Sequence, residues 1–281
     1  MSSNAGIDRS ASGVPGRLAN IDGMEIEVLH GIAQAREVEK LQTEIWSANE
    51  SWVVPSHVLL IVSEYGGILL GARVNGALIG FVLGFLAQSH GKLHHASHML
   101  GVLPHCRHHG VGAALKLHQR KMAIEQGLDL MRWTFDPLEA RNAYFNFHKL
   151  GTVCRTYHSN YYGPMPDALN RDLPSDRLLV EWHLREIGRR PGPVVAPQTV
   201  LRNMDGSPEL QIDDIRKDLP ISIEVPRDVQ SIKRESPDLA LSWRLAIRQA
   251  FSLSFGKGFQ AHDFRDGMYI LLPQKESEIE N

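Results

Sequence analysis

Residues 107–112 read Arg-His-His-Gly-Val-Gly and stand where an apolar run ends and a helical pattern begins. The first turn of a helix has free backbone N–H groups and the positive end of the helix dipole. Glycines there let an anion approach the backbone closely, and a pyrophosphate suits such a site. Arg107 can add charge-assisted hydrogen bonds at the rim. Because paired glycines also occur in ordinary tight turns, the motif alone leaves both interpretations open.

Two well-known phosphate motifs are excluded at this position. A Walker P-loop would need Gly-Lys-Ser/Thr, which does not follow Gly112. A dinucleotide fingerprint would need a third glycine and a parallel strand, whereas the preceding pattern is that of an antiparallel meander.

The histidine-rich run at 93–103 is the second place where chemistry could occur. Strict alternation along a strand puts the following residues on one face: His94, Ala96, His98, Leu100 and Val102. A neutral imidazole suits a general base near pH 7, so His98 is the first candidate, His94 the second and Glu64 the third. The chain has 14 histidines, so a structural role for each stays open.

These histidines do not predict a metal site. His94 and His98 are four residues apart, about 13 Å along a strand, and no cysteine or acidic cluster completes the set. The two cysteines, Cys106 and Cys154, have neither metal nor redox spacing. We therefore expect no metal and a reducing, cytoplasmic setting.

The elements that must position these residues follow from periodicity and turn signals. Asn75-Gly76 predicts a two-residue hairpin turn, and 57–67 fits either a helix, which we favour, or a strand. The expected order is strand, helix, helix, three strands, helix, strand, helix and two strands, over the ranges 25–31, 33–46, 57–67, 68–74, 77–87, 93–103, 111–127, 128–137, 138–151, 152–158 and 176–184. This order predicts an α/β (α+β) fold, with a mixed, mostly antiparallel sheet flanked by helices.

Composition divides the chain further. We expect a disordered leader at 1–22, a first domain at 23–187, a Pro/Gly/Arg-rich linker at 188–198, a smaller C-terminal α/β lobe at 199–274 and a disordered tail at 275–281. The leader lacks the apolar core of a signal peptide, and the apolar runs are too short to span a membrane. With a formal net charge of −2, neither nucleic acid nor a membrane is an expected partner.

The pattern V-x-P-x-x-R-x-x-G-V-G-x-x-L, Val102 to Leu115, closely resembles the acyl-CoA loop of the GNAT N-acyltransferases. The predicted order of elements from 25 to 184 matches the layout of that family, and 138–151 resembles its second coenzyme-binding element. The run WTFDPLEARNAYFNFHKLG also looks like a bacterial GNAT subgroup with a C-terminal extension.

The resemblance implies acetyl-CoA or another acyl-CoA as cosubstrate, with the thioester carbonyl near the backbone of Leu100 to Val102. It implies that these residues bind the cosubstrate: Leu100, Gly101, Val102, Arg107, His108, His109, Gly110, Val111, Gly112, Ala113, Asn142, Phe145, Phe147 and Lys149.

The second element departs from the family pattern. Aligning its end at Gly151 puts Phe147 where the family usually has the tyrosine that protonates the leaving thiolate. Tyr144 lies three residues earlier on a similar helix face and is the candidate acid, although a thiolate can also take its proton from water. Asn142 is displaced by two positions and can still bond the pantetheine arm. Core packing stays open for the aromatic residues of this helix.

We expect an acyl-CoA-dependent N-acyltransferase that transfers an acetyl or larger acyl group by direct attack of a small-molecule amine on the thioester. If the acceptor is an amino acid, Arg132, Arg141 and Arg155 are candidate carboxylate binders. The alternatives are a non-catalytic CoA-binding regulatory protein and a protein or peptide N-acetyltransferase.

The C-terminal segment repeats the order strand, helix, strand, strand, without an acyl-CoA loop. It reads as a degenerate half-GNAT lobe that covers the acceptor site or forms a homodimer interface, or as a stabilising appendage.

Overall fold

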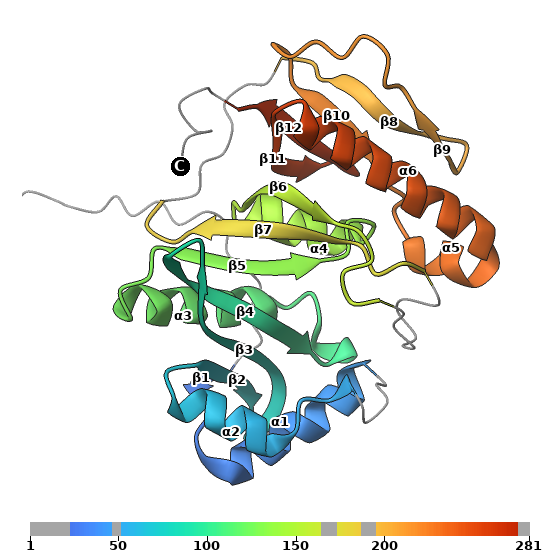
Figure 1. Ribbon diagram of the computed structural model, residues 1–281. Helices are drawn as coiled ribbons and strands as arrows, with labels where there is room; N and C mark the ends of the chain where they lie inside the picture. The colour runs from blue at the N-terminus through green and yellow to red at the C-terminus, as the bar shows by residue number, and fades with distance from the viewer. Residues whose placement is uncertain (1–22, 47–51, 164–172, 187–194, 275–281) are drawn as a thin grey trace, which may run out of the picture.

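The computed structural model describes residues 23–46, 52–163, 173–186 and 195–274. Their strands form one twelve-stranded sheet in the order β1-β2-β3-β4-β5-β7-β6-β11-β12-β10-β8-β9 (Figure 1). The strands of the first domain are β1 (Met24–Val28), β2 (Ile68–Val74), β3 (Ala77–Ser89), β4 (Lys92–Val102), β5 (Leu130–Phe135), β6 (Val153–His158) and β7 (Arg177–His183). Its helices are α1 (Gly31–Trp46), α2 (Ser56–Glu64), the 3₁₀ turn η2 (Pro104–Cys106), α3 (Val111–Glu125), α4 (Ala140–Ala143) and the π-helix η3 (Tyr144–Lys149).

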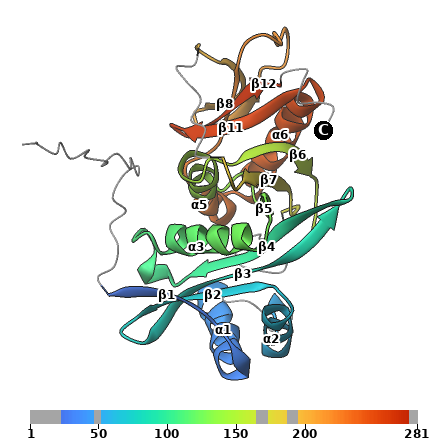
Figure 2. The same ribbon diagram turned by 90° about the vertical axis from the view of Figure 1, so that its left-hand side faces the viewer.

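The helices of the first domain cover both faces of β1–β4. Val38 and Leu41 of α1 and Leu59 of α2 pack on Phe81 and Leu83 of β3 in one apolar cluster. On the other face, α3 packs through a second cluster that includes Leu115 and Val82. Figure 2 shows α3 separated from α1 and α2 by these strands. The expected fold class and the expected order of elements through β7 are confirmed.

Two local features of β4 interrupt its regular pairing. Opposite β3, the register passes from Gly84↔Ser97 to Leu83↔Met99, so His98 is the extra residue of a β-bulge. Against β5, β4 is paired in parallel only at His95↔Met131 and Ala96↔Arg132. Beyond these pairs the two strands diverge, which leaves a gap in the sheet after Ser97.

The C-terminal lobe continues the same sheet. β11 joins β6 through the pair Ala261↔Cys154, so no sheet edge separates the two parts. The elements of the lobe are β8 (Gln198–Met204), β9 (Ser207–Leu210), β10 (Ile221–Glu224), α5 (Val229–Glu235), α6 (Pro237–Gly256), β11 (Phe259–Arg265) and β12 (Met268–Pro273). β8, β9 and α5 were not among the expected elements.

One apolar cluster joins the lobe to the first domain. It contains Trp243 and Phe251 of α6 together with Phe135 of β5 and Val180 of β7. Within the described ranges, no helix is long and apolar enough to cross a membrane.

Candidate active site

The glycine loop leads directly into the first turn of α3. Gly110 is the N-cap and has a φ of 79°, a left-handed conformation that glycine adopts without strain. No side chain among the described residues caps this terminus, and the first helical bond runs from the N–H of Ala114 to the oxygen of Gly110. The N–H groups of residues 111–113 precede this first bond, so they are available to an anion.

The loop opens into a cleft of about 1190 Å³, called here the main cleft. Most residues expected to bind the cosubstrate line it: Leu100, Gly101, Val102, Arg107, His108, Gly110, Val111, Gly112, Ala113, Asn142, Phe145 and Lys149, with Tyr144 beside them. Nε of Arg107 donates to the carbonyl of Val102 at 3.2 Å, which ties the loop to the end of β4.

A second cavity of about 400 Å³, the inner pocket, lies at the gap between β4 and β5. His98 lines it, as do the aromatic side chains of Trp46, Trp52, Trp133, Phe135, Phe145 and Tyr162. The two cavities adjoin, because they share these lining residues: Trp46, Leu100, Thr134, Phe135, Asn142, Phe145 and Arg177.

The bulge in β4 overturns the expected alternation along this strand. Leu100 and Val102 pack in the cluster beneath α3, whereas Met99 packs in the cluster beneath α1 and α2. The extra residue at His98 reverses the phase of every later side chain. The prediction that His94, Ala96, His98, Leu100 and Val102 share one face is therefore wrong.

His98 reaches the inner pocket because it is the bulged residue. Its ring lies 6.0 Å from that of Phe85 and remains accessible to solvent. Partial burial lowers the pKa of His98, which favours a neutral imidazole near pH 7. His94 is buried and lines neither cavity. Its pKa is lowered mainly by burial and, to a smaller extent, by the positive charge of Arg132. Glu64, at the end of α2, lines neither cavity either.

The π-helix changes the interpretation of the second coenzyme element. At the end of η3, the backbone N–H of Leu150 donates to the carbonyl oxygen of Phe145, five residues earlier in the chain. The α-helical spacing that would align Tyr144 with Phe147 is lost. Tyr144 is 40% exposed in the main cleft and stacks on His148, with ring centroids 4.7 Å apart. Phe147 is 2% exposed and packs edge-on against Tyr269. Neither Phe147 nor His109 lines the main cleft or the inner pocket.

Sequence reasoning missed Lys116, which lines the inner pocket although only 2% of the residue is exposed. Its Nζ lies 2.7 Å from Oγ of Ser97 and 3.6 Å from the centroid of the Trp133 ring. Ser97 and Trp133 belong to β4 and β5, so the amine sits where these strands part. Burial lowers the pKa of Lys116 well below its usual value, which favours a neutral amine. The helical spacing of Gly112, Lys116, Gln119 and Ala123 could have predicted this position of Lys116, since these residues share one helix face.

Two of the three arginines considered for a substrate carboxylate are already paired. Arg132 and Arg155 both reach Glu181, at 2.5 and 3.6 Å. Arg141 lines the main cleft.

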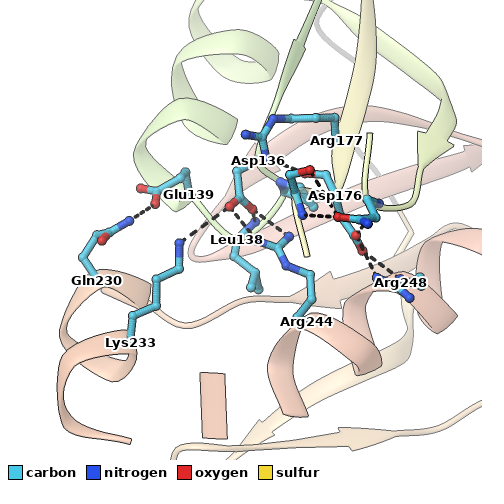
Figure 3. Close-up of polar contacts among 12 residues, drawn as sticks. Asp136, Leu138, Glu139, Asp176, Arg177, Gln230, Lys233, Arg244 and Arg248 are labelled. Carbon is cyan, nitrogen blue, oxygen red and sulfur yellow. Dashed lines mark hydrogen bonds and ion pairs between the residues drawn. The ribbon is translucent and has the colours of Figure 1, made fainter. Parts of the chain in front are cut away.

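Asp136, at the end of β5, joins the main cleft to the C-terminal lobe (Figure 3). Two nitrogens of Arg244 bond its carboxylate at 2.9 and 2.6 Å, and Nζ of Lys233 lies 3.8 Å away. Burial by itself would raise the pKa of Asp136, but the charge of Arg244 outweighs it and holds the pKa at about 2. Inside the first domain, the backbone N–H of Leu138 donates to Oδ1 of Asp136 at 2.9 Å and fixes the turn toward α4.

Residues 33–151 match the model of the acetyltransferase (GNAT) family. These residues form a GNAT acetyltransferase domain. No curated protein matches the chain. The glycine loop, β4 and β5 lie within the matched residues, and this family transfers acetyl groups from acetyl-CoA.

Solved structures similar to this GNAT domain cover just over half of the chain. The ribosomal-protein-S18-alanine N-acetyltransferase from Escherichia coli is 14% identical, with a TM-score of 0.47 over 59% of this chain and 97% of that one. The PaiA N-acetyltransferase from Thermoplasma acidophilum in complex with coenzyme A is 18% identical, with a TM-score of 0.44 over 57% and 98%. An aminoglycoside 6'-acetyltransferase type Ii is 15% identical, with a TM-score of 0.47 over 58% and 99%.

Proposed function

We propose that this chain transfers an acetyl or larger acyl group from acyl-CoA to the amine of a small molecule by direct attack on the thioester. The observation that carries the proposal is that the two cavities adjoin at the gap between β4 and β5, where they share part of their lining. An anion-binding helix terminus opens on one of them, and His98 lines the other.

The charged groups of the main cleft suit the cosubstrate. Its pyrophosphate takes the free N–H groups at the start of α3, while Arg107 adds a cation at the rim. Asn142 and Phe145, which line both cavities, accompany the pantetheine arm into the gap. The thioester carbonyl then lies near the backbone of Leu100 to Val102, where fixed donors stabilise the negative charge of the tetrahedral intermediate.

The proposed reaction balances as follows. The neutral amine forms a C–N bond with the carbonyl carbon, and His98 accepts the proton that the attacking nitrogen loses. The C–S bond then breaks, and its electron pair leaves with the sulfur. Tyr144, which lines the main cleft, or a water molecule supplies the proton that converts the CoA thiolate to the thiol.

The walls of the inner pocket favour a small apolar acceptor. Aromatic and aliphatic side chains make up more than half of the lining, and among the described residues that line the pocket none is acidic. A polycation such as an aminoglycoside needs carboxylates, so this pocket does not suit it. A compact amine with an apolar or aromatic body fits, because it buries that body against the tryptophans and Phe135.

Release of CoA thiol from acetyl-CoA, measured over a panel of apolar amines, amino acids and peptides, tests the proposal. We expect turnover with compact apolar amines and a loss of at least about 100-fold in kcat in His98→Ala. His118→Ala, on an exposed face of α3, is the matched control and should retain activity. Tight CoA binding without turnover on any amine would make the chain a non-catalytic CoA-binding protein. Turnover restricted to peptides would replace the small-molecule acceptor.

A further inference from the structure

The C-terminal lobe forms part of the wall of the main cleft. Besides residues of the GNAT domain, the cleft is lined by the following lobe residues: Arg227, Gln230, Phe264, Asp266 and Gly267. They come from the segment that leads into α5 and its first turn, and from the end of β11 with the β11–β12 turn. The N–H of Val225 joins these two segments by bonding the oxygen of Gly267 at 3.0 Å. A lobe that resembles no CoA-binding element in sequence therefore reaches the cosubstrate side of the site.

Contacts at the β5–α4 turn hold this wall in place. Nε2 of Gln230 bonds the Glu139 carboxylate at 2.5 Å inside the cleft. The hydroxyl of Tyr269 donates to the carbonyl of Pro137 at 2.6 Å, and Arg244 bonds the adjacent Asp136 (Figure 3). Because Tyr269 and Arg244 are fully buried, the lobe residues of the cleft have a fixed position relative to the glycine loop.

Arg227 differs from the other cations that the lobe presents to the GNAT domain. Arg244 and Lys233 lie against Asp136, and Arg248 bonds Asp176 (Figure 3). Arg227 is exposed in the cleft and makes no hydrogen bond or ion pair with any residue of the described ranges.

The cleft has more cations than exposed acids. Arg107, Arg141, Lys149 and Arg177 come from the first domain, and Arg227 adds a fifth from the lobe. Against them, Asp136 is neutralised by Arg244, and burial followed by the charge of Asp136 raises the pKa of Glu139. Asp266 is the exposed acid of the lobe wall.

We propose that Arg227 forms an anion subsite for the acyl-CoA cosubstrate, separate from the pyrophosphate site at α3. This inference rests on the proposed function. An acyl-CoA carries anions beyond its pyrophosphate: the 3'-phosphate at one end and, in dicarboxylic acyl groups, a carboxylate at the other. A guanidinium binds either group through two parallel hydrogen bonds.

Titration calorimetry with CoA and 3'-dephospho-CoA tests the subsite. We expect wild-type protein to bind CoA about tenfold more tightly than dephospho-CoA. Arg227→Gln should lose this discrimination by weakening CoA alone, and Arg227→Lys should restore part of it. The matched control is Arg202→Gln, the same charge change at an exposed residue of the lobe that does not line the cleft.

A parallel titration with acetyl-CoA and succinyl-CoA identifies the source of the anion. Weakening of succinyl-CoA alone in Arg227→Gln would assign the subsite to the acyl carboxylate. An equal effect on all four ligands, or no difference from Arg202→Gln, would overturn the inference while leaving CoA binding intact. Absence of CoA binding by wild-type protein would instead refute the proposed function and this subsite with it.

Discussion

Lys116 lies where β4 and β5 part, with its amine between Ser97 of one strand and the Trp133 ring of the other. A buried ammonium would be costly without a carboxylate, and the contacts of Nζ are a hydroxyl, an amide oxygen, a thioether and an aromatic ring. Nζ donates to Oγ of Ser97, the residue before the His98 bulge, and Ser97 in turn donates to Oε1 of Gln119. Lys116 therefore contacts both strands at the point where they part.

Lys116→Met should change how stability depends on pH. Burial holds the folded-state pKa of Lys116 well below 10.5, so between the two pKa values the unfolded chain binds a proton that the folded chain lacks. The free energy of unfolding of the wild type therefore increases as pH rises toward about 10, and that of the variant does not show this increase. We expect urea unfolding from about pH 7 to about pH 10 to show that the free energy of unfolding of the variant, relative to that of the wild type, decreases as pH rises. Lys121→Met, exposed on the same helix, is the control. A pH-independent difference for Lys116→Met would show that the lysine is charged when buried.

His98 makes a separate prediction about the pH dependence of catalysis. A general base acts in its neutral form, so kcat/KM rises with pH through the pKa of the base. Because partial burial lowers the pKa of His98, this rise should lie below pH 6.5. The rise should disappear from the residual activity of His98→Ala, while His118→Ala keeps it. An unchanged profile in His98→Ala would exclude this residue as the base.

At the scale of elements, two backbone irregularities, a β-bulge and a π-helix, determine where side chains of the candidate site point. The bulge in β4 aims His98 into the inner pocket, and the π-helix turns Phe147 into the core. Sequence periodicity predicts strands and helices but assumes that the repeat is never interrupted. It therefore assigned His98 and Phe147 to the faces that a regular strand and a regular α-helix would give them. Such an extra residue is stabilised by tertiary contacts, here those of Ser97 with Lys116 and of Phe147 with Tyr269, which no local pattern encodes.

Phe147→Tyr tests the π-helix directly. In the observed backbone the new hydroxyl would be buried beside Phe135 and Tyr269, so the variant should lose about 1–3 kcal/mol of stability and gain no turnover. Phe145→Tyr, where the side chain faces the two cavities, should stay within about 0.5 kcal/mol of wild type. Urea unfolding together with thiol release measures both effects. Faster turnover at unchanged stability in Phe147→Tyr would indicate an ordinary α-helix with position 147 facing the cosubstrate.

At the scale of the whole molecule, the two parts act as one unit. They share a sheet, an apolar cluster and the buried pair of Arg244 with Asp136. The order of elements through β7 could be predicted because most of these elements carry a clear period or turn signal, although 57–67 fitted both a helix and a strand. The hairpin of β8 and β9 also carries a turn signal, Asp205-Gly206, but the expected order of the lobe, strand, helix, strand, strand, did not include it. That the lobe continues the sheet through Ala261 and Cys154 has no local signal, since strand pairing over such a separation depends on the packed core.

Arg244→Met measures the coupling between the two parts. The change removes both guanidinium hydrogen bonds from the buried Asp136 and leaves it with the N–H of Leu138 and with Lys233 at 3.8 Å, so we expect a loss of about 3–5 kcal/mol in the free energy of unfolding. Adding Asp136→Leu should recover part of this loss because it removes the unpaired charge. Additive losses in the double variant, measured by urea unfolding, would show that the pair does not couple the lobe to β5.

The central claim is that the main cleft binds acyl-CoA through the first turn of α3. Calorimetric titration of CoA into wild-type protein and Gly112→Asp tests it most directly. A Cβ at Gly112 would make ordinary contacts with Leu100 at 3.7 Å and Val102 at 4.0 Å, so the variant should fold. Its carboxylate would oppose the pyrophosphate.

Two controls separate charge from shape in this titration. Gly112→Asn has the same shape without the charge, and Gly256→Asp puts the same charge into open space at the end of α6. We predict saturable binding by wild type and Gly256→Asp, weaker binding by Gly112→Asn and none by Gly112→Asp. Wild-type affinity for CoA in folded Gly112→Asp, or no binding by the wild type, would contradict the account.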